Sequence, residues 1–201
     1  MALCTRAQFI KGPHRADTVA RIHAAKVYLQ PLERLAIFDA DPIPRLNVIP
    51  SAPPRKPLAL HPGSGSERKN WPEAKWAELL QHLADATDLE LLVVGGEAEG
   101  ERLQRLAAAL PPARAQVAQS LPLAELARRL AGCRAFVGHD SGISHLAAAV
   151  GLPCLVLWGD TVEEIWRPPS DGVRVLRHPD GLARLPVADV VEHFQKVCSG
   201  D

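Results

Sequence analysis

The stretch that decides the fold is residues 138–151, which read GHDSGISHLAAAVG. An apolar run at 135–137 comes directly before it, and a second apolar run at 154–158 follows it. This order predicts a strand, a tight polar loop, a short helix and another strand. We therefore expect a βα unit whose polar loop lies at the carboxyl edge of a parallel sheet.

The loop of this unit has the residue types of a helix start and of an anion site. Asp140 and Ser141 are favoured N-cap residues, and Gly142 lets the backbone approach a ligand closely. Free N–H groups and the positive end of the helix dipole would then face a crevice that accepts a phosphate or diphosphate. His145, one turn into the helix, is expected to face the same crevice. For an isolated Asp-Ser-Gly, however, a plain capped helix is the better interpretation.

A second polar loop favours the binding site. Residues 61–72 read HPGSGSERKNWP and separate an apolar run at 58–61 from an amphipathic helix predicted over 72–87. The glycines and serines offer N–H and hydroxyl donors, and Arg68 or Lys69 adds positive charge, which suits a diphosphate. The spacing matches neither G-x-x-x-x-G-K-[ST] nor G-x-G-x-x-G. Two such loops at one sheet edge favour function over a pair of solvated turns.

The rest of the chain alternates between apolar runs and helical patterns. Strands are predicted at 89–94, 116–117 and 173–176, and helices at 97–110, 122–131 and from 187 onward. Earlier in the chain we expect a weak helix at 16–29, a short strand at 35–38 and a proline-rich linker that ends near residue 55. Strands that alternate with helices predict an α/β domain with a parallel sheet after this linker.

Composition argues against several classes of protein. The 23 basic residues balance the 23 acidic residues and are scattered, which is unlike a nucleic-acid-binding surface. No apolar run approaches the roughly 20 residues that span a bilayer, and no signal peptide is recognisable. The four cysteines are widely separated, so we expect no zinc site and a cytoplasmic protein.

Three segments resemble those of glycosyltransferase family 9, the heptosyltransferase-type enzymes that include the ADP-heptose:lipopolysaccharide transferases. They are the two polar loops with their neighbours, at 61–72 and 138–153, and LVLWGDTVEEIWRP at 155–168. The resemblance implies a GT-B architecture of two Rossmann-like lobes, with the nucleotide-sugar in the C-terminal one. It makes residues 56–201 this C-terminal lobe, with helices on both faces of the sheet, and residues 1–55 a remnant of the N-terminal acceptor lobe and the linker.

The resemblance also assigns roles to the first loop. Lys69 matches the family lysine that contacts the donor phosphates, and its charge would offset the charge that develops on the departing nucleoside diphosphate. This is the one catalytic assignment, and a solvated loop lysine is the alternative. Ser64, Gly65 and Ser66 are expected to bind phosphate oxygens.

The other expected donor contacts come from later loops. Four of them lie in the second polar loop and the helix after it: Asp140, Ser141, Gly142 and His145. Glu99 matches a carboxylate that reads the ribose, and Leu121 would border the adenine through its backbone. A structural histidine is the alternative for His145, and a simple helix-start carboxylate is an equal alternative for Glu99.

One departure from the family concerns the general base. Inverting transfer needs a base for the acceptor hydroxyl, which the family supplies from a glycine-rich turn in its N-terminal lobe. Residues 1–55 contain Gly12 as their only glycine and no such turn. A smaller departure is Asp160, where the family commonly has proline.

Two functions follow from the resemblance. The first is an inverting glycosyltransferase that moves a sugar, with heptose as the family's example, from a nucleoside-diphosphate sugar to a glycan or lipopolysaccharide-type acceptor, without metal or other cofactor. This chain would carry the donor lobe. The alternative is a truncated, non-catalytic nucleotide-sugar-binding module, completed by a complementary N-terminal lobe. Peripheral contact with the inner membrane surface is compatible with either function.

Overall fold

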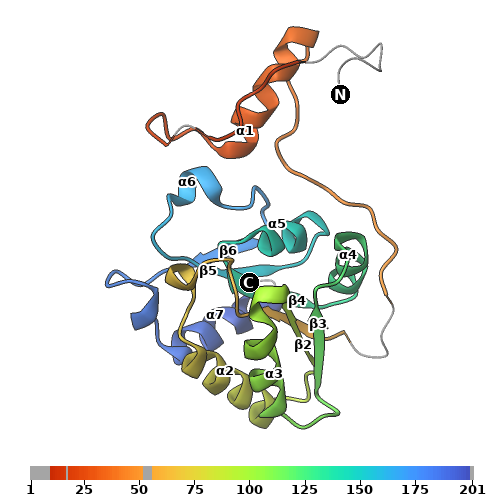
Figure 1. Cartoon of the computed structure of the whole chain (residues 1–201), viewed down its shortest axis with the longest axis vertical. Helices are drawn as coiled ribbons and strands as arrows, with labels where there is room; N and C mark the ends of the chain where they lie inside the picture. Colours follow the sequence, from red (N-terminus) through yellow and green to blue (C-terminus); the bar gives the residue numbers. More distant parts are fainter. Residues whose placement is uncertain (1–9, 17, 52–55, 200–201) are drawn as a thin grey trace.

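The computed structural model describes residues 10–16, 18–51 and 56–199, and in this part of the chain six strands form one parallel sheet (Figure 1). They are β1 (Leu58–His61), β2 (Leu91–Gly95), β3 (Ala115–Gln119), β4 (Ala135–His139), β5 (Cys154–Leu157) and β6 (Val173–Leu176). Their order is β3-β2-β1-β4-β5-β6, which is the order of a Rossmann-like sheet. The predicted fold class is therefore confirmed.

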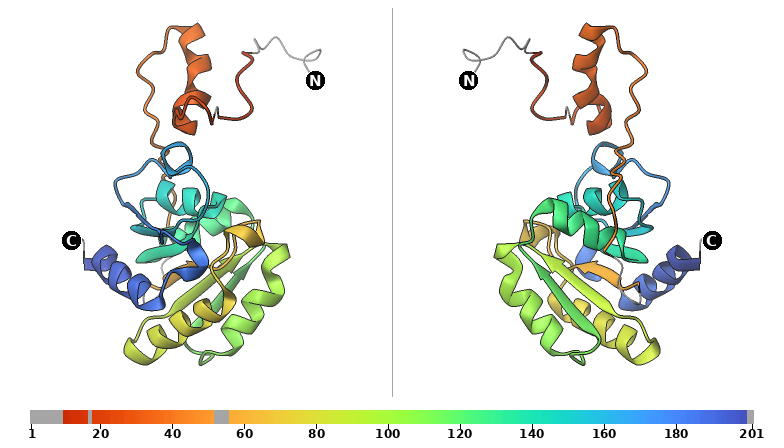
Figure 2. Two further views of the ribbon diagram at one scale, coloured as in Figure 1. Left: turned by 90° about the vertical axis from the view of Figure 1, so that its left-hand side faces the viewer. Right: turned by 90° about the vertical axis from the view of Figure 1, so that its right-hand side faces the viewer.

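Helices cover both faces of the sheet (Figure 2). One face packs against α2 (Glu73–Ala86), α3 (Gly100–Ala108) and α7 (Val187–Ser199), and the other packs against α4 (Leu123–Ala131) and α5 (Gly142–Ala149). Because β1, β2, β4 and β5 are buried along their whole length, these strands read as continuous apolar runs rather than as alternating patterns.

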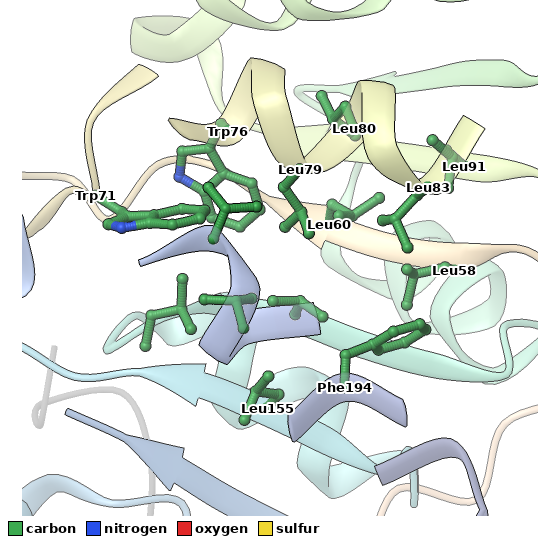
Figure 3. Close-up of a cluster of buried hydrophobic side chains, with 14 of the residues drawn as sticks. Leu58, Leu60, Trp71, Trp76, Leu79, Leu80, Leu83, Leu91, Leu155 and Phe194 are labelled. Atoms are coloured by element: carbon green, nitrogen blue, oxygen red, sulfur yellow. The ribbon is translucent and has the colours of Figure 1, made fainter. Parts of the chain in front are cut away.

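The larger core cluster anchors one end of the first polar loop (Figure 3). Trp71, at the end of this loop, is 1% exposed, and its ring meets that of Trp76 on α2 edge to face, with centroids 5.4 Å apart. Its indole Nε1 donates a hydrogen bond of 3.0 Å to the carbonyl oxygen of Leu185. The loop therefore ends at a fixed point of the core.

The segment before the domain lies beside the sheet and contacts it through α6 (Glu163–Trp166) (Figures 1 and 2). The helix predicted at 16–29 is shorter in the structure, where α1 spans Ala24–Leu29. A second short helix, η2 (Gln30–Leu35), follows it directly. Ala24 and Val27 pack against Ile165, which is fully buried. The segment is thus tied to the domain by a small apolar cluster.

Two sequence predictions for this segment meet different outcomes. The strand predicted at 35–38 is wrong, because Leu35 ends η2 and Ala36 has a left-handed φ of 58°. Residues 39–51 form no helix or strand, as the prolines predict, and hydrogen-bond to the domain through Leu46 and Ser51. The predicted boundary near residue 55 lies outside the described residues.

Candidate functional site

The site lies where β1 and β4 pair side by side. Leu60 pairs with Val137, and His61 pairs with Gly138. The chain leaves β1 toward α2 on one face and leaves β4 toward α5 on the other. In a parallel sheet such a divergence opens a crevice at the carboxyl edge, where nucleotides bind in folds of this type.

Lys69 and Asp140 meet at this edge of the sheet. Lys69 belongs to the short helix η3 (Glu67–Lys69), and its Nζ lies 3.0 Å from Oδ2 of Asp140. The Lys69 side chain is 36% exposed and that of Asp140 is 10% exposed, so the ammonium group is within reach of a ligand. The structure therefore brings the two polar loops into direct contact.

A third loop reaches the same carboxylate. Thr161, after β5, donates a hydrogen bond of 2.7 Å from Oγ1 to Oδ2 of Asp140. Thr161 is not among the residues predicted from the sequence. Its position just after β5 could have indicated it, because β5 pairs with β4 in parallel and the carboxyl ends of the two strands lie at one edge.

The amino end of α5 lies at the same edge of the sheet. Ser141 is the N-cap residue, and its Oγ accepts a hydrogen bond from the backbone N–H of Ser144. Gly142, the first residue of α5, is exposed and has open space where a Cβ would stand. The helix start predicted from the sequence is confirmed, and it lies next to Asp140.

The first loop is braced from within. The hydroxyl of Ser64 lies 2.7 Å from Oδ1 of Asn70 and 2.9 Å from the carbonyl oxygen of Ser66, so it donates its proton to an oxygen within the loop. Gly65 has a φ of +71° and is exposed, as is Ser66. The positive φ favours glycine at this position. Among the described residues, no atom beyond its chain neighbours lies within 4 Å of the place where a Cβ of Gly65 would stand, so the backbone is open there.

Two buried histidines, His61 and His139, stand at the ends of β1 and β4. Nε2 of His139 accepts a hydrogen bond of 2.8 Å from the N–H of Trp71, and Nδ1 lies 3.1 Å from the carbonyl oxygen of Gly63. These partners place the proton on Nδ1, because an N–H can only donate and a carbonyl oxygen can only accept. Burial lowers the pKa of both imidazoles to about 4.

The remaining predicted residues occupy different parts of the carboxyl edge. Glu99 accepts a hydrogen bond of 2.7 Å from the Gly96 N–H, and its side chain packs over Gly63, where an added Cβ would displace the Glu99 carboxylate. His145 is half-buried on α5, and burial lowers its pKa against the opposing charge of Asp140. Leu121 follows β3 and packs against the apolar cluster under α4 and α5.

Two kinds of feature are absent from the described residues. No three histidine, cysteine, aspartate or glutamate side chains among them are grouped so that they could hold a metal ion. No helix in the described ranges is long and apolar enough to cross a membrane.

Comparison with known proteins decides the family. The sequence model described as glycosyltransferase family 9 (heptosyltransferase) matches residues 28–188. The chain belongs to this family. Lipopolysaccharide heptosyltransferase 1 of Pseudomonas aeruginosa is 41% identical over 131 residues, which are 65% of this chain and 33% of that protein. Lipopolysaccharide heptosyltransferase 2 of Escherichia coli K12 is 28% identical over 132 residues, which are 64% of this chain and 38% of that protein.

Solved structures of family 9 proteins share the fold. The E. coli heptosyltransferase WaaC with ADP superimposes with a TM-score of 0.67 at 29% identity, over 73% of this chain and 46% of that one. A family 9 glycosyltransferase from Veillonella parvula gives 0.78 at 18% identity, over 96% of this chain and 63% of that one. The chain thus spans well under half the length of the curated relatives that it matches.

Proposed function

We propose that this chain binds the nucleotide-sugar donor of an inverting heptosyltransferase, with ADP-heptose as the donor and a lipopolysaccharide-type glycan as the acceptor of the whole protein. The observation that carries the proposal is the Lys69–Asp140 contact at the crevice between β1 and β4. The relatives support the choice of ligand, because one is named as a complex with ADP and another as a complex with ADP-2-deoxy-2-fluoro heptose.

In this proposal the diphosphate lies between the first loop and the amino end of α5. Lys69 offsets the negative charge that develops on the departing ADP, and the helix dipole acts in the same sense. Backbone N–H groups around Gly65, Ser66 and Gly142 bind phosphate oxygens. This arrangement supplies positive charge from the protein itself, so we propose that the donor binds without a metal ion.

The other donor groups extend along the carboxyl edge from this point. Glu99 is proposed to bind the ribose, because it packs over Gly63 at the start of the first loop. Leu121 is proposed to border the adenine. Asp140 and His145 are proposed to contact the sugar side of the donor, where a carboxylate and a neutral imidazole can bind hydroxyl groups.

The hydroxyls of Ser64 and Ser141 have a different part in the proposal. Both are used within the protein, one to brace the first loop and one to cap α5. We propose that Ser64 and Ser141 act on the phosphates mainly by fixing the backbone N–H groups around them.

The proton of the acceptor hydroxyl must also be taken up during inverting transfer. We assign this role to none of the described residues, because every side chain assigned above is proposed to act on the donor. We therefore propose sugar transfer for the whole protein, with the N-terminal lobe of the family as the partner of this domain and residue 55 as the approximate division. A module that binds nucleotide-sugar without catalysis is the alternative, and an assay of heptose transfer distinguishes the two.

Isothermal titration calorimetry with ADP tests donor binding. Lys69→Ala is expected to weaken ADP binding about 10- to 100-fold, because it removes a charge-assisted contact to phosphate. Lys196→Ala is a matched control, since Lys196 also pairs with a carboxylate, that of Glu192, but lies near the end of α7. Equal ADP affinity of the Lys69→Ala variant and the unmodified protein would contradict the proposed site.

A further inference from the structure

One buried side chain outside the predicted site, His139, ties both ends of the first polar loop to the sheet. The loop leaves β1 at Gly63, whose carbonyl oxygen is bound by Nδ1 of the imidazole. It enters α2 after Trp71, whose N–H is bound by Nε2 of the same ring. The ring lies at the end of β4 and is completely buried. A single side chain thus fixes the separation of two points of the loop.

The residues proposed to bind phosphate lie between those two points. They are Gly65, Ser66 and Lys69, and Ser64, which braces the loop, lies there as well. We propose that His139 is a positioning residue that holds this loop in its phosphate-binding shape, an inference that rests on the proposed function. A loop that is already ordered loses less conformational entropy when the ligand binds, so the ordering appears as ligand affinity.

The geometry suits a neutral imidazole. The two hydrogen bonds of His139 need a donor that faces the Gly63 carbonyl and an acceptor that faces the Trp71 N–H, at fixed positions on one rigid group. The neutral ring supplies both, and the edge of Trp76 packs against it with centroids 5.4 Å apart. A protonated ring would turn a second N–H toward the Trp71 N–H and lose that bond. The burial that keeps the ring neutral therefore preserves the tie.

The same histidine also connects the first loop to the second. His139 comes directly before Asp140, and its carbonyl oxygen accepts a hydrogen bond from the hydroxyl of Ser144 on α5. A shift of the ring would therefore change the distance between Lys69 and the amino end of α5. The tie thus acts on both proposed sides of the diphosphate.

The test compares ADP with adenosine, which lacks the phosphate groups. His139→Phe keeps an aromatic ring against Trp76 and removes both hydrogen bonds. We expect about tenfold weaker binding of ADP, or a larger loss, and adenosine affinity within about twofold of the unmodified protein. His193→Phe is the matched control, because His193 lies on α7 and bonds its own helix at Asp189.

A smaller substitution covers the case in which the phenylalanine variant fails to fold. His139→Asn keeps an amide N–H near the position of Nδ1 and is expected to bind ADP with an affinity between those of the unmodified protein and His139→Phe. If only the asparagine variant folds, weaker ADP binding with unchanged adenosine binding still supports the proposal. Thermal unfolding of each variant shows that the protein measured is folded.

Three results would overturn the inference. The first is a folded His139→Phe or His139→Asn variant that binds ADP as tightly as the unmodified protein. The second is an equal loss of ADP and adenosine affinity, which would indicate a general structural role. The third is an unmodified protein that binds neither ligand, which would also contradict the proposed function and is therefore distinguishable from the first two.

Discussion

Lys69 and Asp140 act in opposite directions on an anion in the crevice. The ammonium attracts a diphosphate, whereas the carboxylate repels it and pairs with the ammonium in the structure. The proposal places Asp140 beside the sugar, where a carboxylate accepts hydroxyl protons. The two residues should therefore respond differently to ADP and to an ADP-sugar.

Asp140→Asn tests this division. The substitution removes the repulsion of the diphosphate and frees Lys69, so we expect ADP to bind several-fold more tightly. We expect the preference for ADP-heptose over ADP to fall, because the amide is a weaker acceptor than the carboxylate. Calorimetric titration with both ligands measures the two affinities. A drop in ADP affinity like that expected for Lys69→Ala would contradict the division.

At this scale the sequence predicted the loops better than the connections between them. Lys69, Asp140 and Ser141 stood out because their types and loop positions suit phosphate. The contact of Thr161 with Asp140 and the tie made by His139 depend on which strands pair, and a linear pattern does not show that pairing. His61 and His139 could have been noticed because each is a polar residue at the last position of an otherwise apolar strand.

Among the elements, β1 and β4 end in residues that lower the free energy of unfolding in acid. His61 and His139 are buried there, and burial lowers the pKa of each to about 4 from an ordinary value of 6.5. Between these values the unfolded chain binds more protons than the folded one. The free energy of unfolding therefore falls as the pH drops from 6.5 toward 4, and this loss is absent above 6.5.

Thermal unfolding at several pH values measures this effect. The loss is expected to be roughly 2 kcal/mol for each imidazole at pH 5 relative to pH 7.5. His61→Gln should make the dependence between pH 6.5 and 4 shallower, because glutamine does not titrate. A dependence of the same steepness in His61→Gln would contradict the assigned cause.

Helices and strands of the domain followed from their apolar patterns. The helix predicted over 72–87 spans Glu73–Ala86, with Trp76, Leu79, Leu80 and Leu83 buried at helical spacing. The pattern failed before the domain, where Leu35, Ile37 and Phe38 are exposed and form no strand. Apolar residues predict an element only where a neighbouring surface covers them, and the sequence alone does not show that surface.

In the whole molecule, α6 connects the segment before the domain to the cluster that includes α5. His23 bonds the Arg167 carbonyl oxygen at 2.8 Å, and Arg21 pairs with Glu164 at 3.2 Å. On its other side, Trp166 of α6 packs against the apolar cluster that includes Ala147 and Ala148 of α5. The parallel sheet was predictable from the alternation of strands and helices. This bridge was not, because it joins residues far apart in the chain.

A crystal structure of this chain with bound ADP tests the central claim most directly. The account predicts that one diphosphate contacts both polar loops, with oxygens within hydrogen-bond distance of Lys69 Nζ and of backbone N–H groups at the start of α5. ADP bound elsewhere, or bound at the crevice by only one of the two loops, would contradict it.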